Sequence, residues 1–156
     1  DVYKRQLNYN ACRISEFLDL KKENVHLKEQ YFDVVAAKTE NGVRKVPIAD
    51  KLLPFYEAWF ERSPCEYLLC TTEGQHLDYF NYCDTYWDPL MEEYDMKHTP
   101  HDTRHTCISM MADAGVAPTI QKKIAGHSGA MSLTERVYTH LDIQTLIDGI
   151  NMICPV

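Results

Sequence analysis

The sequence has no long hydrophobic run and no cysteine pair of the C-x-x-C type. No apolar stretch approaches the ~20 residues that a membrane-spanning helix requires, and nothing resembles a secretory signal. The six cysteines are scattered, which favours neither a disulfide framework nor a zinc ribbon. We therefore expect a cytoplasmic protein without membrane contact, whose cysteines are reduced thiols, several of them in the core.

Basic residues are also few. The chain has 16 Lys and Arg against 23 Asp and Glu, so its formal net charge is −7. This balance argues against a general nucleic-acid footprint, because such proteins draw much of their affinity from basic side chains that neutralise phosphates. Binding to nucleic acid would require basic residues gathered on one face, or another domain that supplies most of the affinity.

What the sequence does have is an ordinary globular composition. Its 156 residues are 45% hydrophobic and 25% charged, which suits one domain with a real core. No internal repeat, low-complexity tract or linker divides it. Residues 1–10 are polar without a clear period, so we expect a disordered or truncated lead-in, followed by one domain over residues 11–156.

The first part of that domain combines a short helix with a small sheet. Residues 11–20 carry apolar side chains at helical spacing, with Arg13 near the start of the helix. Residues 25–48 instead alternate β-favouring runs with turn signals, which predicts antiparallel strands at 25–28, 31–37 and 43–48.

The hairpin between the last two strands carries basic residues. Asn41-Gly42 is a strong hairpin signal, because both residues tolerate positive φ, and it places Lys38 beside the tip. A lysine there is usually solvated. A twisted hairpin with Lys38, Arg44 and Lys45 would also present a basic finger to a nucleic-acid groove.

The second half of the chain reads as mainly helical. Asp50 is a plausible cap for a helix that ends near residue 62, and residues 67–70 form a short extended piece. Further helices are expected at 78–94, broken near Pro89, at 101–114 and at 118–126, with glycines ending the last two. A short helix carrying Tyr138 precedes a final helix with an apolar stripe of Ile143, Leu146, Ile147 and Ile150, which must be buried on this chain or on a neighbour.

The stretch Thr99–Thr106 contains the most suggestive pair. Pro100 suits a helix start, so His101 and Arg104, three residues apart, would point to the same face. A titratable imidazole beside a permanent guanidinium is suited to handling phosphate. The pair alone is weak support, because short H-x-x-R matches occur by chance in many helices.

Five motifs occur together in one order along the chain. They are Cys12-Arg13-Ile14-Ser15-Glu16, Lys38 before the hairpin turn, His101-x-x-Arg104-His105-Thr106, Gly126-His127-Ser128 and Tyr138-Thr139-His140. From about residue 11 to the end, this set resembles the catalytic domain of the tyrosine recombinases, the phage-integrase family. The resemblance implies an α+β fold, mainly α-helical with a small antiparallel three-stranded sheet, and site-specific recombination of DNA.

The resemblance also implies how the covalent step proceeds. Tyr138 would be the nucleophile, forming a 3′-phosphotyrosyl link to DNA and releasing a 5′-hydroxyl. The covalent intermediate stores the bond energy, so resealing needs no ATP. Arg13 and Arg104 would hold the nonbridging phosphate oxygens and stabilise charge in the transition state.

Three further residues complete the implied catalytic set. His101 would help to remove the tyrosine proton, His127 would hydrogen-bond the phosphate, and Lys38 would protonate the leaving oxygen. No metal or other cofactor is required, because the arginines and the lysine supply the positive charge. Glu16, one helical turn from Arg13, either orients that arginine or pairs with it at the surface.

The implied partner is double-stranded DNA that carries attachment sites. The candidate DNA contacts are Arg13, Lys38, Arg44, Lys45 and Arg104. Members of the family often dock their last helix on a neighbouring subunit, so we expect self-association on DNA through the C-terminal helix. They also carry a core-binding domain ahead of the first arginine, which we expect to be missing here.

Three alternatives remain open at this point. A type IB topoisomerase-like enzyme shares the chemistry but relaxes supercoils, and a DNA-binding or assembly module would retain the fold without cutting. The third alternative is a metal site, because His101 and His105 have the i, i+4 spacing of zinc ligands and His98 and Cys107 are near in sequence. Arg104 argues against zinc, since it places a fixed positive charge among the ligands.

Overall fold

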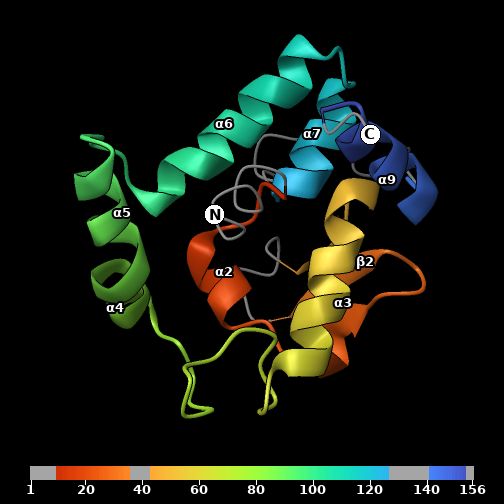
Figure 1. Cartoon of the computed structure of the whole chain (residues 1–156). Coiled ribbons are helices and arrows are strands. Elements are labelled where there is room, and N and C mark those ends of the chain that lie inside the picture. The colour runs from red at the N-terminus through yellow and green to blue at the C-terminus, as the bar shows by residue number, and fades with distance from the viewer. Residues whose placement is uncertain (1–9, 36–42, 127–140, 154–156) are drawn as a thin grey trace.

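A small antiparallel sheet and the helices around it make up the structure (Figure 1). The computed structural model describes residues 10–35, 43–126 and 141–153. The strands β1 (Val25–His26), β2 (Tyr31–Val34) and β3 (Arg44–Pro47) form a sheet of order β1-β2-β3. Both pairings are antiparallel, with Phe32 opposite Val25 on one side and Val46 on the other. The predicted mainly helical fold with three antiparallel strands is therefore confirmed.

The strands are shorter than the sequence predicts. Strand β1 ends at His26, β2 ends at Val34, and β3 begins at Arg44 and ends at Pro47. The hairpin turn and Lys38 lie outside the described residues.

The first helix, α2 (Ile14–Leu18), is also shorter than the predicted 11–20. Ala11 has a left-handed φ of +49°, and Arg13 is an extended N-cap, so the chain turns before the helix begins. Asn10 is buried and its side-chain amide donates to the Tyr56 hydroxyl at 3.2 Å. The packed domain thus includes Asn10, which we had assigned to the lead-in.

The centre of the core is a group of aromatic rings between α2, the sheet and α3 (Leu53–Arg62). The ring of Phe17 lies 6.3 Å from that of Phe32, 6.0 Å from that of Tyr56 and 6.1 Å from that of Trp59, between centroids. Short 3-10 turns, η1 (Lys22–Asn24) and η3 (Asp50–Leu52), precede β1 and α3. Burial of these rings fixes α2, and with it Arg13, relative to the sheet.

Residues 79–93 form one continuous helical arm rather than two broken helices. It comprises α4 (Tyr79–Tyr82), the π-helical stretch η4 (Cys83–Trp87) and α5 (Asp88–Glu93). Proline lacks an N–H and its ring crowds the preceding turn. Here the wider π-helical stretch ends at Trp87, shortly before Pro89, so the helix continues without a break. The extended piece predicted at 67–70 is reduced to the isolated bridges Lys21–Tyr67 and Cys70–His76.

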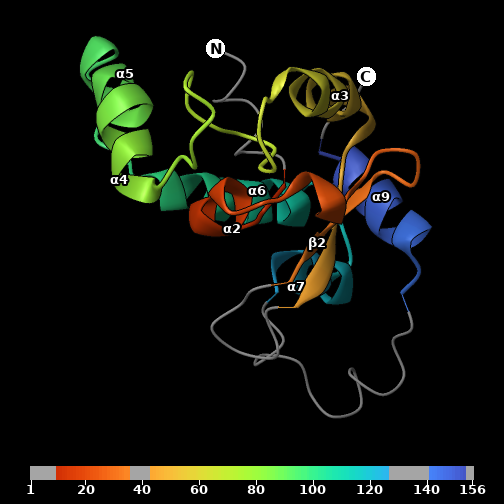
Figure 2. The ribbon, with the colours of Figure 1, turned by 90° about the horizontal axis from the view of Figure 1, so that it is seen from below.

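Three longer helices complete the described fold: α6 (Pro100–Asp113), α7 (Pro118–Ala125) and α9 (Ile143–Asn151). Gly115 and Gly126, with φ of +76° and +72°, follow α6 and α7 as predicted. Helices α7 and α9 both pack against β3, while α4 and α5 lie at the opposite end of the molecule from α9 (Figures 1 and 2).

The apolar stripe of α9 is buried on this chain. Leu146, Ile147 and Ile150 are at most 4% exposed, and the helix contacts β3 and α7. Gly149 allows this close packing, because a Cβ there would lie 2.8 Å from Cγ2 of Ile120. Among the described residues, no helix is both long enough and apolar enough to cross a lipid bilayer.

Candidate active site

Helix α6 positions the His101 and Arg104 pair. The helix begins as its sequence dictates: Thr99 is the N-cap, Pro100 is the first helical residue, and the Asp102 carboxylate accepts from the Thr99 backbone N–H at 2.7 Å. Arg104 then points inward and is 2% exposed, whereas His101 remains exposed. On this helix the guanidinium therefore lies within the protein and the imidazole at its surface.

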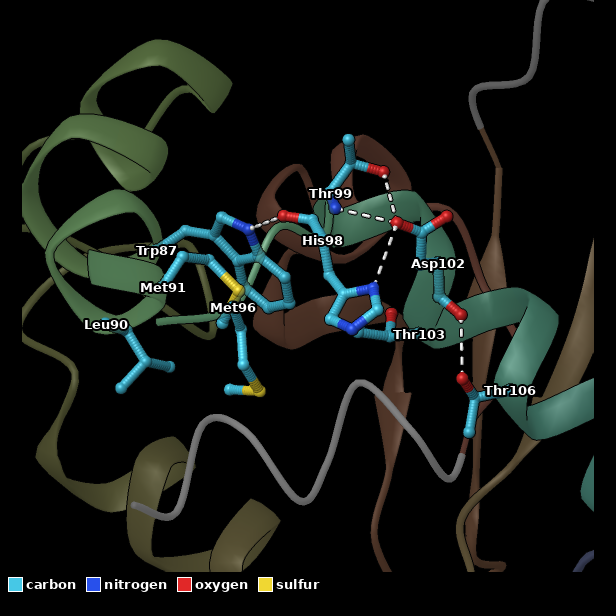
Figure 3. A pocket seen from close by; sticks show the side chains of 9 residues that line it. All are labelled: Trp87, Leu90, Met91, Met96, His98, Thr99, Asp102, Thr103 and Thr106. Atoms are coloured by element: carbon cyan, nitrogen blue, oxygen red, sulfur yellow. Dashed lines mark hydrogen bonds and ion pairs between the residues drawn. The ribbon is translucent and has the colours of Figure 1, made fainter. Parts of the chain in front are cut away.

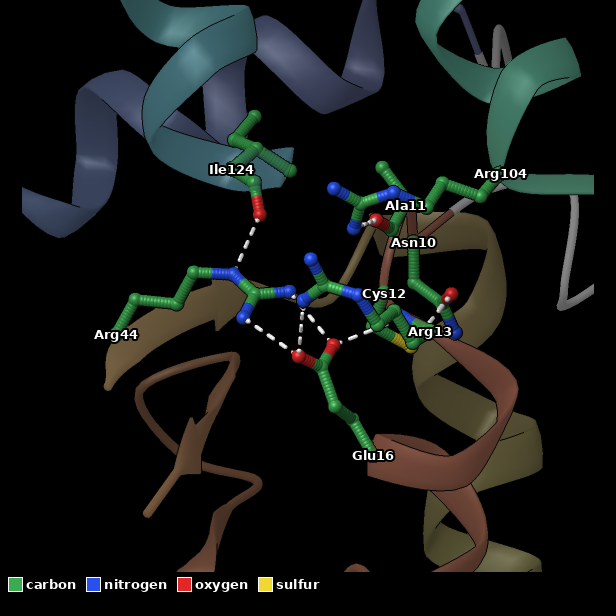
Figure 4. Close-up of polar contacts among 8 residues, drawn as sticks. All are labelled: Asn10, Ala11, Cys12, Arg13, Glu16, Arg44, Arg104 and Ile124. Carbon is green, nitrogen blue, oxygen red and sulfur yellow. Dashed lines mark hydrogen bonds and ion pairs between the residues drawn. The ribbon is translucent and has the colours of Figure 1, made fainter. Parts of the chain in front are cut away.

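The Arg104 guanidinium is only partly satisfied by the protein. Its Nη1 donates to the Ala11 carbonyl at 2.6 Å (Figure 4), an acceptor presented by the left-handed turn at Ala11. Its Nη2 is buried and has no hydrogen-bond partner among the described residues. Burial, followed by the nearby charges of Arg13 and Arg44, lowers the pKa of Arg104. A buried charged donor without an acceptor is costly, so the site is suited to an anionic ligand.

Glu16 lies between two arginines. Its carboxylate accepts from the Arg13 backbone N–H at 2.8 Å and from Arg13 Nη1 at 2.9 Å, and it is bound on its other side by Arg44 Nη2 at 2.9 Å and Nη1 at 3.2 Å (Figure 4). Its side chain is 6% exposed. Burial raises the pKa of Glu16, but the hydrogen bonds and charge of Arg44 and Arg13 outweigh that effect and lower it overall. Glu16 thus orients Arg13, and because its carboxylate is buried, the pair is not an ordinary surface ion pair.

Arg44 does not belong to an exposed basic finger, so this part of the sequence prediction is wrong. Its side chain is 3% exposed, and its Nε donates to the Ile124 carbonyl at 2.9 Å near the end of α7. A Cβ on Gly126 would lie 2.9 Å from Arg44 Cζ. Arg44 therefore joins α2, β3 and the end of α7, and it is not available for a DNA groove. Lys45, the next residue, is exposed, with Nζ 3.8 Å from the centroid of the Tyr31 ring.

Sequence reasoning missed the joint role of Glu16 and Arg44, although one signal was present. Arg44 alternates with Val46 and Ile48 along β3 and the residues that follow it, and both of those side chains are fully buried. The two-residue period of a strand places Arg44 on the same inward face. A cation on a core face requires an acid, and in the structure that acid is Glu16 of the Arg13 motif.

His101 lies in a positively charged environment. Its ring contacts that of His105, with centroids 4.9 Å apart and an edge-to-face geometry. Partial burial, then the charges of His105, Arg104 and Arg13, lower the pKa of His101. The structure thus places His101 within electrostatic range of Arg104 and Arg13 and favours the neutral imidazole, which can accept a proton.

The other three predicted catalytic residues, Lys38, His127 and Tyr138, lie outside the described residues. The described part of the chain does lead up to one of them, since Gly126 ends α7 and His127 follows it in sequence.

The zinc alternative gains no support from the described residues. His98 and Asp102 form a loose pair at 3.9 Å, Cys107 is fully buried, and no group of three or more metal-ligating side chains converges in this part of the chain. A cavity of about 300 Å³ lies beside the start of α6 (Figure 3), lined mainly by apolar side chains of Trp87, Leu90, Met91 and Met96. Neither His101 nor Arg104 lines this cavity, so the candidate active site is elsewhere on α6.

Comparison with known proteins identifies relatives of the whole domain. The phage integrase family model matches residues 6–145. The chain is 30% identical over 146 residues to the tyrosine recombinase XerA of Thermococcus onnurineus, covering 90% of this chain and 50% of the relative. It is 26% identical over 156 residues to XerC of Vibrio vulnificus, covering 92% of this chain and 46% of the relative.

Solved structures show the same fold. The Tn1549 transposon integrase in complex with transposon right end DNA superposes with a TM-score of 0.72 and 21% identity, over 92% of this chain and 55% of that one. A crystal structure of XerA recombinase gives a TM-score of 0.69 and 24% identity, over 96% of this chain and 56% of that one.

The chain spans about half the length of the curated tyrosine recombinases XerA and XerC. The family match covers most of the chain and includes Arg13, His101, Arg104 and Tyr138. The chain therefore belongs to the phage integrase family.

Proposed function

We propose that this chain is the catalytic domain of a site-specific recombinase that cuts and rejoins double-stranded DNA by transesterification. The observation that carries the proposal is the unpaired donor of Arg104, which is buried near Arg13 and whose charge acts on His101. Arg13 and His101 thus lie within electrostatic range of Arg104, one donor of which lacks an acceptor. A phosphodiester supplies both the negative charge and the oxygen acceptors that these donors require.

In this proposal, Arg104 and Arg13 bind the nonbridging oxygens of the scissile phosphate. Both guanidinium groups are held before DNA arrives, Arg104 by the Ala11 carbonyl and Arg13 by Glu16. Fixed donors stabilise developing charge without reorganising in the transition state, and removing one from comparable sites costs about 2.7–4 kcal/mol of barrier. Glu16 and Arg44 act as positioning residues, because they hold Arg13 and do not reach the phosphate.

The bonding changes follow from the family resemblance. The Tyr138 oxygen forms a bond to phosphorus, the bond from phosphorus to the 5′-oxygen breaks, and Lys38 protonates that oxygen. His101 accepts the tyrosine proton, and the environment that lowers its pKa keeps it neutral near pH 7. His127 donates to the phosphate. In the reverse step the 5′-hydroxyl of a new strand attacks the phosphotyrosine, and each proton returns.

The DNA surface includes Lys38 and Lys45 in addition to the two site arginines. Lys45 is exposed on β3 next to the start of the hairpin. Its ammonium is held over the Tyr31 ring, so it is ordered before it meets a phosphate.

We further propose that the protein acts in the cytoplasm and self-associates on DNA. The C-terminal helix remains the proposed route, but the stripe first considered for a neighbour is covered by β3 and α7. Contact through α9 would then use its exposed side and its C-cap residue Met152, which is 51% exposed.

A covalent-trapping assay tests the central proposal. The purified chain is incubated with a nicked suicide duplex, from which the short fragment that carries the released 5′-hydroxyl diffuses away. The DNA–protein adduct is then detected on a denaturing gel. We expect an adduct that is absent in Tyr138→Phe and retained in Tyr94→Phe, which removes the hydroxyl of an exposed tyrosine. Lack of any adduct, with retained binding in a gel shift, would instead indicate a non-cutting module.

A second substrate separates recombination from a topoisomerase-like activity. Two duplexes with matching attachment sites should give joined recombinant products, whereas relaxation of a supercoiled plasmid without joined products would favour the topoisomerase alternative. DNA binding should be measured by gel shift in the same experiment, because the acidic composition of this chain weakens its general electrostatic attraction to phosphates.

A further inference from the structure

Two cysteine thiols converge on one hydroxyl, at the opposite end of α3 from η3. Ser63, the C-cap of α3, has its Oγ 3.7 Å from the Cys65 sulfur and 3.5 Å from the Cys70 sulfur. The same Oγ donates to the Tyr67 carbonyl at 2.5 Å, which folds the intervening segment back on itself. The two thiols also share a hydrogen bond with each other. The fold of this segment thus holds both sulfur atoms together.

The two thiols have different electrostatic environments. Burial opposes ionisation of Cys65, but hydrogen bonds shared with the Tyr67 backbone, the Cys70 thiol and the Ser63 hydroxyl, and the charge of Lys22, lower its pKa overall. The Lys22 ammonium is close, because its Nζ donates to the Ser63 carbonyl at 2.6 Å. Burial and the neighbouring Cys65 raise the pKa of Cys70. One thiol is therefore the better nucleophile and the other remains protonated beside it.

Both thiols are accessible to a small oxidant. Cys65 and Cys70 are half-buried, and a cavity of about 360 Å³ is lined by Ser63 and Cys70. Two of the other described cysteines differ in this respect. Cys12 and Cys107 are at most 2% exposed, and burial is the main cause that raises the pKa of Cys12 to about 12.

We propose that Cys65 and Cys70 form a redox-active pair that closes to an intramolecular disulfide when the protein meets a peroxide. The Cys65 thiolate attacks one peroxide oxygen, so that a sulfur–oxygen bond forms, the oxygen–oxygen bond breaks and one water leaves after protonation. The Cys70 sulfur then attacks the sulfenic acid, forming the sulfur–sulfur bond and releasing a second water. The two thiols lose two electrons, which reduce the peroxide, and a dithiol reductant reverses the reaction.

The pair lies on a segment that contacts the chain directly after α2. The Glu66 carbonyl accepts from the Lys22 backbone N–H and the Leu68 N–H donates to the Leu20 carbonyl, both at 2.8 Å. The Lys21 ammonium also pairs with the Glu66 carboxylate at 2.8 Å. Disulfide formation would therefore occur in a segment that is already anchored on both sides of Tyr67. The proposal concerns this segment alone and does not depend on DNA cleavage.

Mass spectrometry with a glutamate-specific protease tests the proposal. Cleavage after Glu61, Glu66 and Glu73 separates Cys65 (residues 62–66) from Cys70 (residues 67–73), and Cys83 falls in a third peptide. After treatment with hydrogen peroxide and alkylation of free thiols, we expect 62–66 and 67–73 to be joined by a bond that dithiothreitol reverses. Non-reducing gels should show a monomer, which distinguishes this product from a bridge between chains.

Single substitutions assign the two roles. In Cys70→Ser, Cys65 should accumulate as a sulfenic acid that dimedone traps, whereas Cys65→Ser should leave Cys70 largely unreacted. Cys83→Ser is the matched control and should leave the disulfide unchanged. In the unmodified chain Cys65 should be alkylated on the order of tenfold faster than Cys83, because burial raises the pKa of Cys83. Failure of the two peptides to join, or equal reactivity of Cys65 and Cys83, would overturn the proposal.

Discussion

Replacement of Arg44 by methionine tests the organisation of the site most directly. Arg44 contributes two contacts to the Glu16 carboxylate, at 2.9 and 3.2 Å, and a third to the Ile124 carbonyl at 2.9 Å. Methionine has a similar length but no donor, so the substitution removes all three contacts while filling much of the same space. It leaves a carboxylate that is 6% exposed and still paired with Arg13.

The expected loss of stability is large. Removing one partner of a buried ion pair typically costs about 3–5 kcal/mol, because the remaining charge stays desolvated. Domains of this size are stable by only about 5–15 kcal/mol, so Arg44→Met should remain folded at low temperature but unfold much earlier in urea. Arg44→Lys keeps the charge but loses the fork that binds both carboxylate oxygens. Its free energy of unfolding should therefore lie between those of the unmodified chain and Arg44→Met.

The pH dependence provides an independent check on the cause. The folded-state pKa of Glu16 is lowered from 4.5, so its ionic contacts stabilise the protein above that pH and are lost as the pH falls through the lower folded-state value. In Arg44→Met only Arg13 remains to offset the burial of the carboxylate, so protonation of Glu16 destabilises that variant less. The difference in unfolding free energy between the two proteins should therefore shrink as the pH falls below 4.5.

Urea unfolding followed by circular dichroism measures these differences, with Arg62→Met as the matched control. Arg62 is an exposed arginine in the last turn of α3, and its loss should change stability by less than about 0.5 kcal/mol. The reasoning fails if Arg44→Met costs less than about 1 kcal/mol, or if its deficit is the same at neutral and acidic pH.

Further substitutions test the other features of the site and its support. Gly126→Ala should cost about 2 kcal/mol or more in urea unfolding, because it combines a left-handed φ of +72° with a Cβ only 2.9 Å from Arg44 Cζ. Gly149→Ala should also destabilise, by about 1–3 kcal/mol from crowding against Ile120, although alanine favours a helix by about 1 kcal/mol; a net gain would contradict the close packing of α9 on α7. The NMR titration midpoint of His101 should lie below 6.5 and rise in His105→Gln, and an unchanged midpoint would show that His105 does not contribute.

Local sequence signals predicted much of the helical fold because they act over a few residues. Pro100 by itself indicates a helix start, and Gly115 and Gly126 take up the left-handed conformation that ends a helix. The start of α2 could not be predicted in this way. Its position depends on Ala11, whose carbonyl binds Arg104 from 93 residues away.

The residues of the site also divide into those that local sequence signals reveal and those that only long-range contacts reveal. His101 and Arg104 were recognised because one helix carries both, and Arg13 because it lies in a recognisable motif. Arg44 was misassigned, since the basic character of the hairpin suggested a surface and only the fold shows the buried acid opposite it. A long-range ion pair of this kind gives little signal in the sequence around either residue.

The position of that ion pair also answers the objection raised by the acidic composition. Net charge acts over the whole surface, and at physiological ionic strength its influence is screened within about 8 Å. The site instead gathers the guanidinium groups of Arg13, Arg44 and Arg104 around the single carboxylate of Glu16. The carboxylate offsets part of the repulsion among the cations and leaves the inner donor of Arg104 unpaired. An acidic chain can therefore hold a cationic site suited to phosphate. The condition is that the buried acid, Glu16, binds Arg13 and Arg44 and leaves one donor of Arg104 unpaired.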